Sequence, residues 1–221
     1  MGELRYVTVT GEGRDTSMPG ETASMNFLAN VVLKKNSPEL KAFKATLEKI
    51  WDAYKAVEPQ AKGTITYGRM SKCAGIKDIT VEVEDKNDID PETDKVRRVD
   101  TDEVMVTFKT STTWPDGKDK VVKKYANRKD AEGKLYAAEV TKLVDDATWT
   151  IGNGSTGILH GIVMGNTTGG KAKLTLLLTA VQLGNLVKYS GDVEDVQIDT
   201  NAEVTDFGED DDVAPEEGVE V

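Results

Sequence analysis

The sequence has a single cysteine, a single histidine and no long apolar segment. Cys73 alone cannot form an internal disulfide or a cysteine-based zinc cluster. His160 alone cannot form a histidine cluster for a metal, and it leaves only one imidazole for catalysis. Serine-hydrolase, cysteine-protease and zinc-enzyme functions are therefore poor interpretations, and we expect no catalytic residues, no metal and no cofactor.

Segments that insert into membranes are also missing. No apolar run approaches the roughly 20 residues of a membrane-spanning helix. The first residues, Met1-Gly-Glu-Leu-Arg5, contain no apolar signal region. We therefore expect a cytoplasmic protein that makes no contact with a membrane.

Basic residues are outnumbered, 28 against 39 acidic residues, so the formal net charge is −11. Thirteen of the acidic residues lie between Asp192 and Val221, a stretch without Lys or Arg, which leaves 26 acidic and 28 basic residues in 1–191. A segment of such charge repels itself and buries little. We therefore predict a folded domain over 1–191, of net charge +2, and a disordered acidic tail over 192–221, acting either as a solubiliser or as an interaction segment.

One helix is clearly indicated. Ser37-Pro38-Glu39 is a helix start, with serine as N-cap, proline at the first helical position and an acid in the first turn. Apolar residues then recur at helical spacing: Leu40, Phe43, Leu47, Ile50, Trp51, Tyr54 and Val57. This pattern predicts a helix over 37–57 that packs on a sheet.

Strand-like patterns cover much of the remainder. Residues 23–35 alternate apolar and polar positions, which predicts a strand with one buried face, and Val104, Val106 and Phe108 alternate again. Further short elements are a strand near Tyr6, strands over Thr64–Tyr67 and Ile79–Val83, a helix over Ala137–Leu143 and a strand from Ile158 to Met164. The apolar run Leu174–Leu186 fits either a strand or a helix. Many short strands and Gly-rich turns indicate a mainly-β fold, a small barrel or sandwich with one attached helix.

Two glycine-rich segments resemble nucleotide-binding motifs. Gly152-x-Gly154-x-x-Gly157 matches the dinucleotide fingerprint, but no helical pattern follows it to receive a pyrophosphate. Gly165-Asn-Thr-Thr-Gly-Gly-Lys171-Ala172 is a near match to the phosphate loop, with Ala172 in place of the hydroxyl that binds Mg²⁺. A degenerate phosphate-loop nucleotide-binding enzyme is therefore one alternative function, and a hairpin loop is the simpler interpretation.

The stretch from Phe108 to Lys134 combines positive charge with aromatic rings. It contains eight basic residues against four acidic ones, interleaved with Phe108, Trp114 and Tyr125. Proteins that bind single strands use cations along the phosphates and flat rings that stack on unpaired bases. A solvated basic loop with packed aromatics is the alternative. The candidate DNA-binding residues are Phe108, Lys109, Trp114, Lys118, Lys120, Lys123, Lys124, Tyr125 and Arg128, with Lys171 and Lys173 from the later glycine loop.

The C-terminal third resembles a known family. Ile151-Gly-Asn-Gly-Ser155, the strand after it, a Gly-Gly loop and then Thr179-Ala-Val-Gln182-Leu183 are similar to the replication-type single-stranded DNA-binding proteins of tailed bacteriophages. In the N-terminal half, a strand ending in Leu33-Lys-Lys35 and then the Ser37 helix follow the same order. The resemblance implies an OB-like five-stranded barrel, an acidic C-terminal tail, and Leu174–Leu183 as a closing barrel strand.

From the residues and the resemblance together we expect a protein that binds single-stranded DNA with little sequence preference during phage DNA replication or recombination, in the cytoplasm of the bacterial host. The tail would contact replication proteins such as polymerase or helicase and compete with DNA. Its candidate residues are Asp206, Phe207, Glu209, Asp210, Asp211, Asp212, Glu216, Glu217 and Glu220. A homo-oligomer is compatible with this interpretation, and a structural or adaptor β-protein of the virion is the second alternative.

Overall fold

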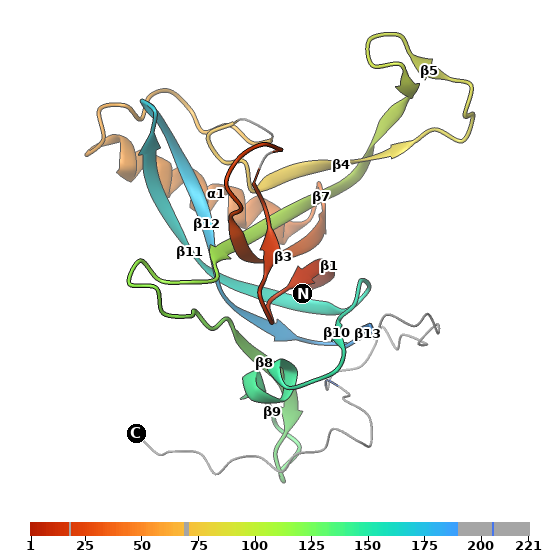
Figure 1. Ribbon diagram of the computed structural model, residues 1–221, viewed down its shortest axis with the longest axis vertical. Helices are drawn as coiled ribbons and strands as arrows, with labels where there is room; N and C mark the ends of the chain where they lie inside the picture. Colours follow the sequence, from red (N-terminus) through yellow and green to blue (C-terminus); the bar gives the residue numbers. More distant parts are fainter. Residues whose placement is uncertain (18, 69–70, 190–204, 206–221) are drawn as a thin grey trace. The chain divides into compact units, whose positions relative to one another are not determined.

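The computed structural model describes residues 1–17, 19–68, 71–189 and 205, and it groups the chain into two compact units. Unit 1 comprises Met1–Val31, Phe108–Ile162 and Leu177–Val221, and unit 2 comprises Val32–Thr107 and Val163–Leu176. The fold is mainly β with one long helix (Figure 1), so the predicted fold class is confirmed. The two units are described separately below.

Thirteen strands and two helices occur in the described part of the chain. The strands are β1 (Gly2–Thr8), β2 (Arg14–Asp15), β3 (Met25–Lys34), β4 (Ile76–Glu82), β5 (Ile89–Asp90), β6 (Lys95–Val96), β7 (Arg98–Ser111), β8 (Lys123–Lys129), β9 (Leu135–Glu139), β10 (Thr150–Ile151), β11 (Thr156–Thr168), β12 (Lys171–Leu183) and β13 (Lys188–Tyr189). The helices are α1 (Pro38–Lys55) and α2 (Thr141–Asp145).

Hydrogen-bonded neighbours in the main sheet follow the order β4-β7-β3-β1-β11-β12-β8-β9, with β2 beside β3. The main sheet therefore has nine strands where a barrel of about five was expected, because short strands such as β2 and β9 add to the long ones. In unit 1, β8 runs parallel to β12, with Lys123 opposite Ala180 and Ala126 opposite Leu183. The run from Leu174 is thus a strand, as the family resemblance implied.

The predicted helix forms in unit 2 for the reasons visible in the sequence. The Ser37 side chain accepts a hydrogen bond from the Leu40 backbone N–H (3.2 Å), and Pro38 opens α1. Leu40, Leu47 and Trp51 are buried along one face, and burial of each such side chain contributes about 1.5–3 kcal/mol. The Trp51 indole N–H donates to the Gly63 carbonyl (2.9 Å), which ties the loop after the helix to its buried face.

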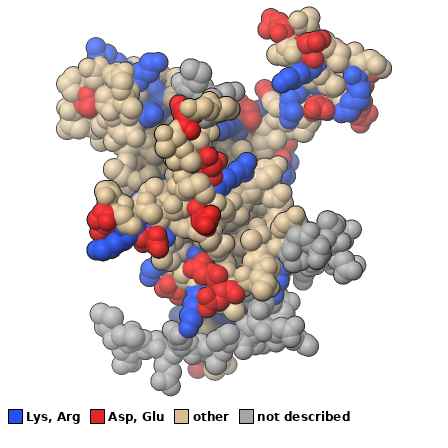
Figure 2. All heavy atoms as spheres, viewed as in Figure 1, with Lys and Arg blue, Asp and Glu red and all other residues tan. Residues whose placement is uncertain are grey.

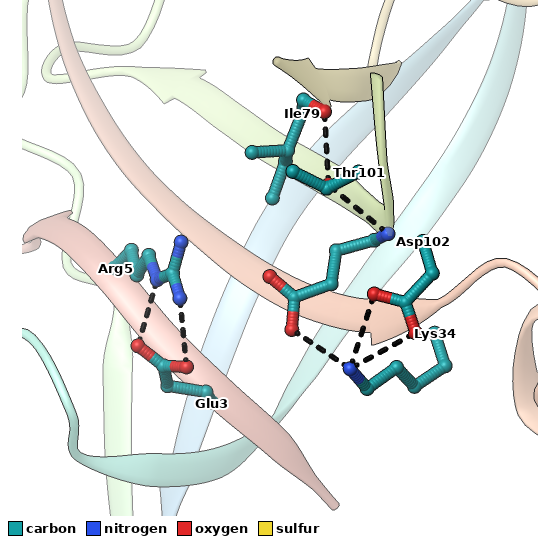
Figure 3. A network of polar contacts seen from close by, with 7 residues as sticks. Glu3, Arg5, Lys34, Ile79, Thr101 and Asp102 are labelled. Carbon is teal, nitrogen blue, oxygen red and sulfur yellow. Dashed lines mark hydrogen bonds and ion pairs between the residues drawn. The ribbon is translucent and has the colours of Figure 1, made fainter. Parts of the chain in front are cut away.

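Several charged side chains in unit 2 form ion pairs with one another. The Lys34 ammonium lies 3.1 Å from an Asp102 carboxylate oxygen, and Thr101 donates to the Ile79 carbonyl (2.9 Å; Figure 3). Where β4 ends and β7 begins, Lys86 and Arg98 both contact Glu82. Figure 2 shows positive and negative side chains intermixed around β5, as these ion pairs require. Lys86, Arg97 and Arg98 are therefore matched by local carboxylates.

Strand β3 corrects one expectation. It was predicted to have one buried face, but nearly all of it is buried on both faces. The polar positions are satisfied by backbone groups in unit 1: Asn26 donates to the Ser24 carbonyl (2.8 Å) and Asn30 donates to the Arg5 carbonyl (2.9 Å). Buried amides that are hydrogen-bonded in this way carry little penalty. Period-two alternation of Asn with apolar residues therefore does not mark a solvent face here.

Two further expectations were wrong. Residues 64–67 form no strand, and Tyr67 makes only an isolated bridge with Cys73. The helix predicted over 137–143 is replaced by strand β9, followed by the single turn α2. The Asp130 carboxylate accepts from the Glu132 and Lys134 backbone N–H groups and closes the β8–β9 hairpin. Pairing across this hairpin outweighs the helix propensity of the Ala-Ala-Glu sequence.

Candidate nucleic-acid interface

Residues 112–120 form a short projecting arm between β7 and β8 in unit 1. The Trp114 carbonyl accepts from the Gly117 N–H (2.9 Å), and the Trp114 N–H donates to the Lys118 carbonyl (2.7 Å). Below this turn, the Lys120 N–H donates to the Thr112 carbonyl (2.7 Å). The sequence Trp-Pro-Asp-Gly thus forms a tight turn, and the Trp114 side chain on it is 56% exposed.

A cation lies directly on the Trp114 ring. The Lys120 ammonium is 4.5 Å from the ring centroid, and it also donates to the Ser111 hydroxyl (2.9 Å). Such cation–π contacts contribute about 0.5–1 kcal/mol at exposed sites. Lys118 is exposed and contacts Asp116 (3.1 Å) on the other side of the turn. The arm thus carries an exposed aromatic ring with the half-buried Lys120 beside it and the exposed Lys118 on its turn.

An open groove lies at the base of the arm. Its volume is about 540 Å³, and its lining residues are Gly11, Glu12, Met25, Phe27, Thr112, Asp119 and Lys120. Gly13 lets the loop around Glu12 approach: its φ is +78°, and a Cβ there would lie 2.8 Å from the Asn26 carbonyl oxygen. Only glycine tolerates both conditions. Lys120 therefore belongs to the groove and to the Trp114 contact at once.

Strand β8 divides the remaining predicted residues between two faces. Lys123 is exposed and contacts Glu139 on β9 (3.1 Å), which raises the pKa of Lys123 and lowers that of Glu139. Tyr125 is half-buried on the same face. Arg128 is half-buried on the opposite face, directly across from Tyr136 of β9. Charge and aromatic surface therefore occur together on this hairpin as well.

Two predicted contact residues are corrected by the structure. Lys124 is 1% exposed, and its ammonium is held by the Asp145 carboxylate at 2.6 Å. Phe108 is 7% exposed, and its ring packs against the backbone of Gly161. An ammonium that is buried and neutralised cannot reach a phosphate, and a ring inside the core cannot stack on a base. Both residues stabilise unit 1 instead.

The other candidates remain at the surface. Lys109, Trp114, Lys118, Lys123, Lys171 and Lys173 are exposed, and Lys120, Tyr125 and Arg128 are half-buried. Lys171 and Lys173 belong to unit 2, at the start of β12. Figure 2 shows several Lys and Arg side chains, with few carboxylates, at this end of unit 2.

Neither glycine-rich motif has the geometry of a nucleotide site. Gly169 and Gly170 have φ of +57° and +72°, and they form the two-residue turn of the β11–β12 hairpin. Such values are those of a type I′ turn. Strand β12 follows this turn, and Gly157 itself lies in strand β11, so neither motif opens a helix whose N-terminus could receive a phosphate. The phosphate-loop interpretation is wrong for this geometry.

Sequence reasoning missed three aromatic side chains that the structure exposes: Tyr6, Tyr136 and Tyr189. Tyr6 has a φ of +51°, a conformation rare for tyrosine, and Asn153 accepts its backbone N–H (2.7 Å). Isolated tyrosines outside a basic stretch carry no pattern that would single them out. The pairing of Tyr136 with Arg128 could have been found only from the hairpin register.

The candidate tail residues from Asp206 onward lie outside the described residues. Thr205, immediately before them, is described and is buried against β8 and β12. Its hydroxyl donates to the Leu183 carbonyl (2.9 Å) and accepts from the Asn127 N–H (3.0 Å), while its own N–H donates to the Asn127 carbonyl (3.0 Å). Thr205 is therefore held by backbone groups of both β8 and β12.

Comparisons with known proteins assign the chain to no family. No protein-family profile matches the chain, and no curated protein matches it. A similar solved structure is gp2.5, a single-stranded DNA-binding protein encoded by bacteriophage T7, with a TM-score of 0.44 and 16% identity over 100% of this chain and 94% of that one. Within the described residues, no helix is long and apolar enough to cross a membrane, and no cluster of three or more His, Cys, Asp or Glu is placed to hold a metal ion.

Proposed function

We propose that the chain binds single-stranded DNA with little sequence preference, without catalysis, during phage DNA replication or recombination. The observation that carries this proposal is the arm, on which Trp114 is exposed and Lys120 lies 4.5 Å from its ring. One face of the indole faces the ammonium, and the other face can stack on an unpaired base. Stacking of one base on an aromatic side chain contributes about 1–3 kcal/mol irrespective of sequence.

Phosphates would be contacted by exposed lysines on the arm and on the strands that flank it in the sequence. Lys118 lies on the arm itself, Lys109 lies on β7 just before it, and Lys123 begins β8 just after it. Bases stacked on Trp114 would place their phosphates within reach of such flexible side chains. Duplex DNA offers the same phosphates but no unpaired face, so single strands are the preferred ligand.

The proposal is tested by titrating fluorescent oligo-dT with the full chain and with Trp114→Ala. We expect about tenfold weaker binding, the equivalent of about 1.4 kcal/mol, and near-normal binding by Trp114→Phe. Tyr189→Ala is the matched control, because Tyr189 is equally exposed in unit 1 but lies on β13. Equal affinity for duplex and single strand, or equal losses in the two alanine variants, would contradict the proposal.

The salt dependence of binding provides a second readout. Each phosphate neutralised on a single strand contributes about −0.7 to the slope of log K against log salt. Replacing Lys118 and Lys123 together by alanine should therefore reduce the slope by about 1.4. If the double variant binds more weakly but with an unchanged slope, these lysines do not contact phosphates. If the wild-type chain binds no oligonucleotide at all, a structural protein of the virion is the better interpretation.

The acidic segment from residue 192 onward is proposed to contact replication proteins such as polymerase or helicase and to compete with DNA. Thirteen acidic residues without a base present carboxylates much as DNA presents phosphates. A tethered segment has an effective concentration on the order of millimolar. Deleting residues 208–221 removes seven acidic residues, and it should tighten oligo-dT binding at low salt more than at high salt. A full-length variant in which those seven acidic residues are replaced by Asn or Gln should show the same tighter binding as the deletion. Unchanged oligo-dT affinity in both variants would refute competition.

A further inference from the structure

Resting on the proposed function, we infer that the groove beside the arm receives the edge of an unpaired base and discriminates in favour of cytosine over thymine. The groove has an apolar floor, made by the buried Phe27 and the half-buried Met25. Its rim carries the exposed carboxylates of Glu12 and Asp119. Its volume of about 540 Å³ lies within the range of sites that bind small organic groups.

The two carboxylates are available for a ligand. Within the described residues, neither the Glu12 nor the Asp119 side chain has a hydrogen-bond or ion-pair partner, whereas Asp116 on the same arm contacts Lys118 at 3.1 Å. Lys120 also lines the groove, but its ammonium is shared with the Ser111 hydroxyl and the Trp114 ring. The groove therefore offers hydrogen-bond acceptors over an apolar floor and has a formal charge of −1.

This chemistry excludes the DNA backbone and favours a base. A phosphate in the groove would face two carboxylates at short range and only one ammonium. A base is neutral and flat, so one of its faces suits the apolar floor, where the half-buried Met25 is the accessible side chain and Phe27 lies buried beneath it. Lys120 joins the groove to the Trp114 ring, so a base in the groove and a base on the ring would be close neighbours along one strand.

The identity of the base follows from donors and acceptors. A carboxylate can only accept hydrogen bonds. Cytosine presents an N4 amino group as a donor, whereas thymine presents the O4 acceptor and a methyl group at the corresponding edge. The Asp119 and Glu12 carboxylates would therefore accept a hydrogen bond from the cytosine N4 amino group and repel the thymine O4 at the same position.

The test compares oligo-dC with oligo-dT of equal length, each titrated with the full-length chain at one salt concentration. The measured quantity is the ratio of the two dissociation constants, dT over dC, in wild type and in variants. Asp119→Asn should lower this ratio about threefold to tenfold, the range for one hydrogen bond in a solvated groove, because an amide both donates and accepts. Adding Glu12→Gln should lower it further.

Asp116→Asn is the matched control. It removes the same charge from the same arm, and its amide oxygen can still accept the Lys118 backbone N–H (3.2 Å). Both variants should strengthen binding to all oligonucleotides through the lost negative charge, but only Asp119→Asn should change the ratio. Differences between the two polymers themselves cancel, because each ratio is compared with that of wild type.

The inference would be overturned if the dT-over-dC ratio were unchanged in Asp119→Asn, or if it fell equally in Asp116→Asn. Neither result would bear on the proposed function, which the Trp114→Ala titration tests separately. If Asp119→Asn instead abolished binding of a lysine-rich peptide and left the ratio intact, the groove would be a site for a cationic protein segment, and the inference would again be wrong. Failure of the wild-type chain to bind either polymer would refute the proposed function itself.

Discussion

Lys124 and Asp145 allow a sharp test of whether a predicted DNA contact is a structural ion pair. Removing Asp145 with Asp145→Ala leaves a buried ammonium without its counter-charge. Breaking a fully buried pair in this way costs about 3–5 kcal/mol. Because the Asp145 side chain is 35% exposed, water can partly replace it, and we expect about 2–3 kcal/mol of lost stability.

Lys124→Met should cost much less. Methionine has a similar length, no charge and no hydrogen bond to satisfy, and the remaining Asp145 carboxylate is exposed enough to be hydrated. Replacing a buried charge by a well-packed apolar side chain is often close to neutral, so we expect a loss within about 1 kcal/mol. The order of the two variants, rather than either absolute value, is the prediction.

Urea unfolding of the full-length variants measures both changes, with stability taken from the midpoint at an unchanged m value. The same Lys124→Met protein should bind oligo-dT with the wild-type salt slope, since the buried Lys124 ammonium contacts Asp145 (2.6 Å) and not solvent. The reasoning fails if Lys124→Met is the less stable variant. It also fails if its salt slope falls by about 0.7, the contribution of one phosphate contact.

The pH dependence of stability gives the same pair a second signature. Burial lowers the pKa of Lys124 below its ordinary value of 10.5. Lys124 therefore has a lower pKa in the folded chain than in the unfolded chain, where it keeps the ordinary value. Between the folded and the unfolded pKa, the unfolded chain binds more protons, so the free energy of unfolding rises with pH in that range. Lys124→Met lacks the titrating group. The difference in stability between wild type and Lys124→Met should therefore shift in favour of wild type as the solution becomes more alkaline.

Two further predictions concern unit 1. The Glu139 pKa is lowered mainly by Lys123, so the contribution of this pair to stability is present above pH 4.5 and is lost as pH falls through the lower folded pKa. Measured by urea unfolding, Glu139→Gln should therefore lose less stability than wild type between pH 5 and pH 3. Equal losses in the two proteins would refute the pairing. Thr205→Val removes the hydroxyl that bonds to Leu183 and Asn127. We expect about 1–3 kcal/mol of destabilisation and faster hydrogen exchange of the Asn127 amide. Unchanged exchange would mean that the Thr205 hydroxyl does not stabilise β8.

Local features of this protein follow from the sequence because they depend on neighbours along the chain. Ser37 caps α1 through a bond to Leu40, only three residues away. The turn after Trp114 needs only the proline, aspartate and glycine that follow it. Alternation from Val104 to Phe108 marks a strand with one apolar face. The turn after Trp114, the long helix and the mainly-β class could therefore be predicted without coordinates.

Long-range pairing decided which side chains belong to the candidate site. Lys123 and Lys124 are adjacent and chemically identical, but successive residues of a strand point to opposite faces. The pairing of β8 with β12 and the position of α2 turn Lys124 inward to Asp145 and leave Lys123 exposed. Likewise, no local pattern connects Glu12 with Asp119. They share a groove because Gly13 lets two distant loops approach, a contact made by the tertiary structure alone.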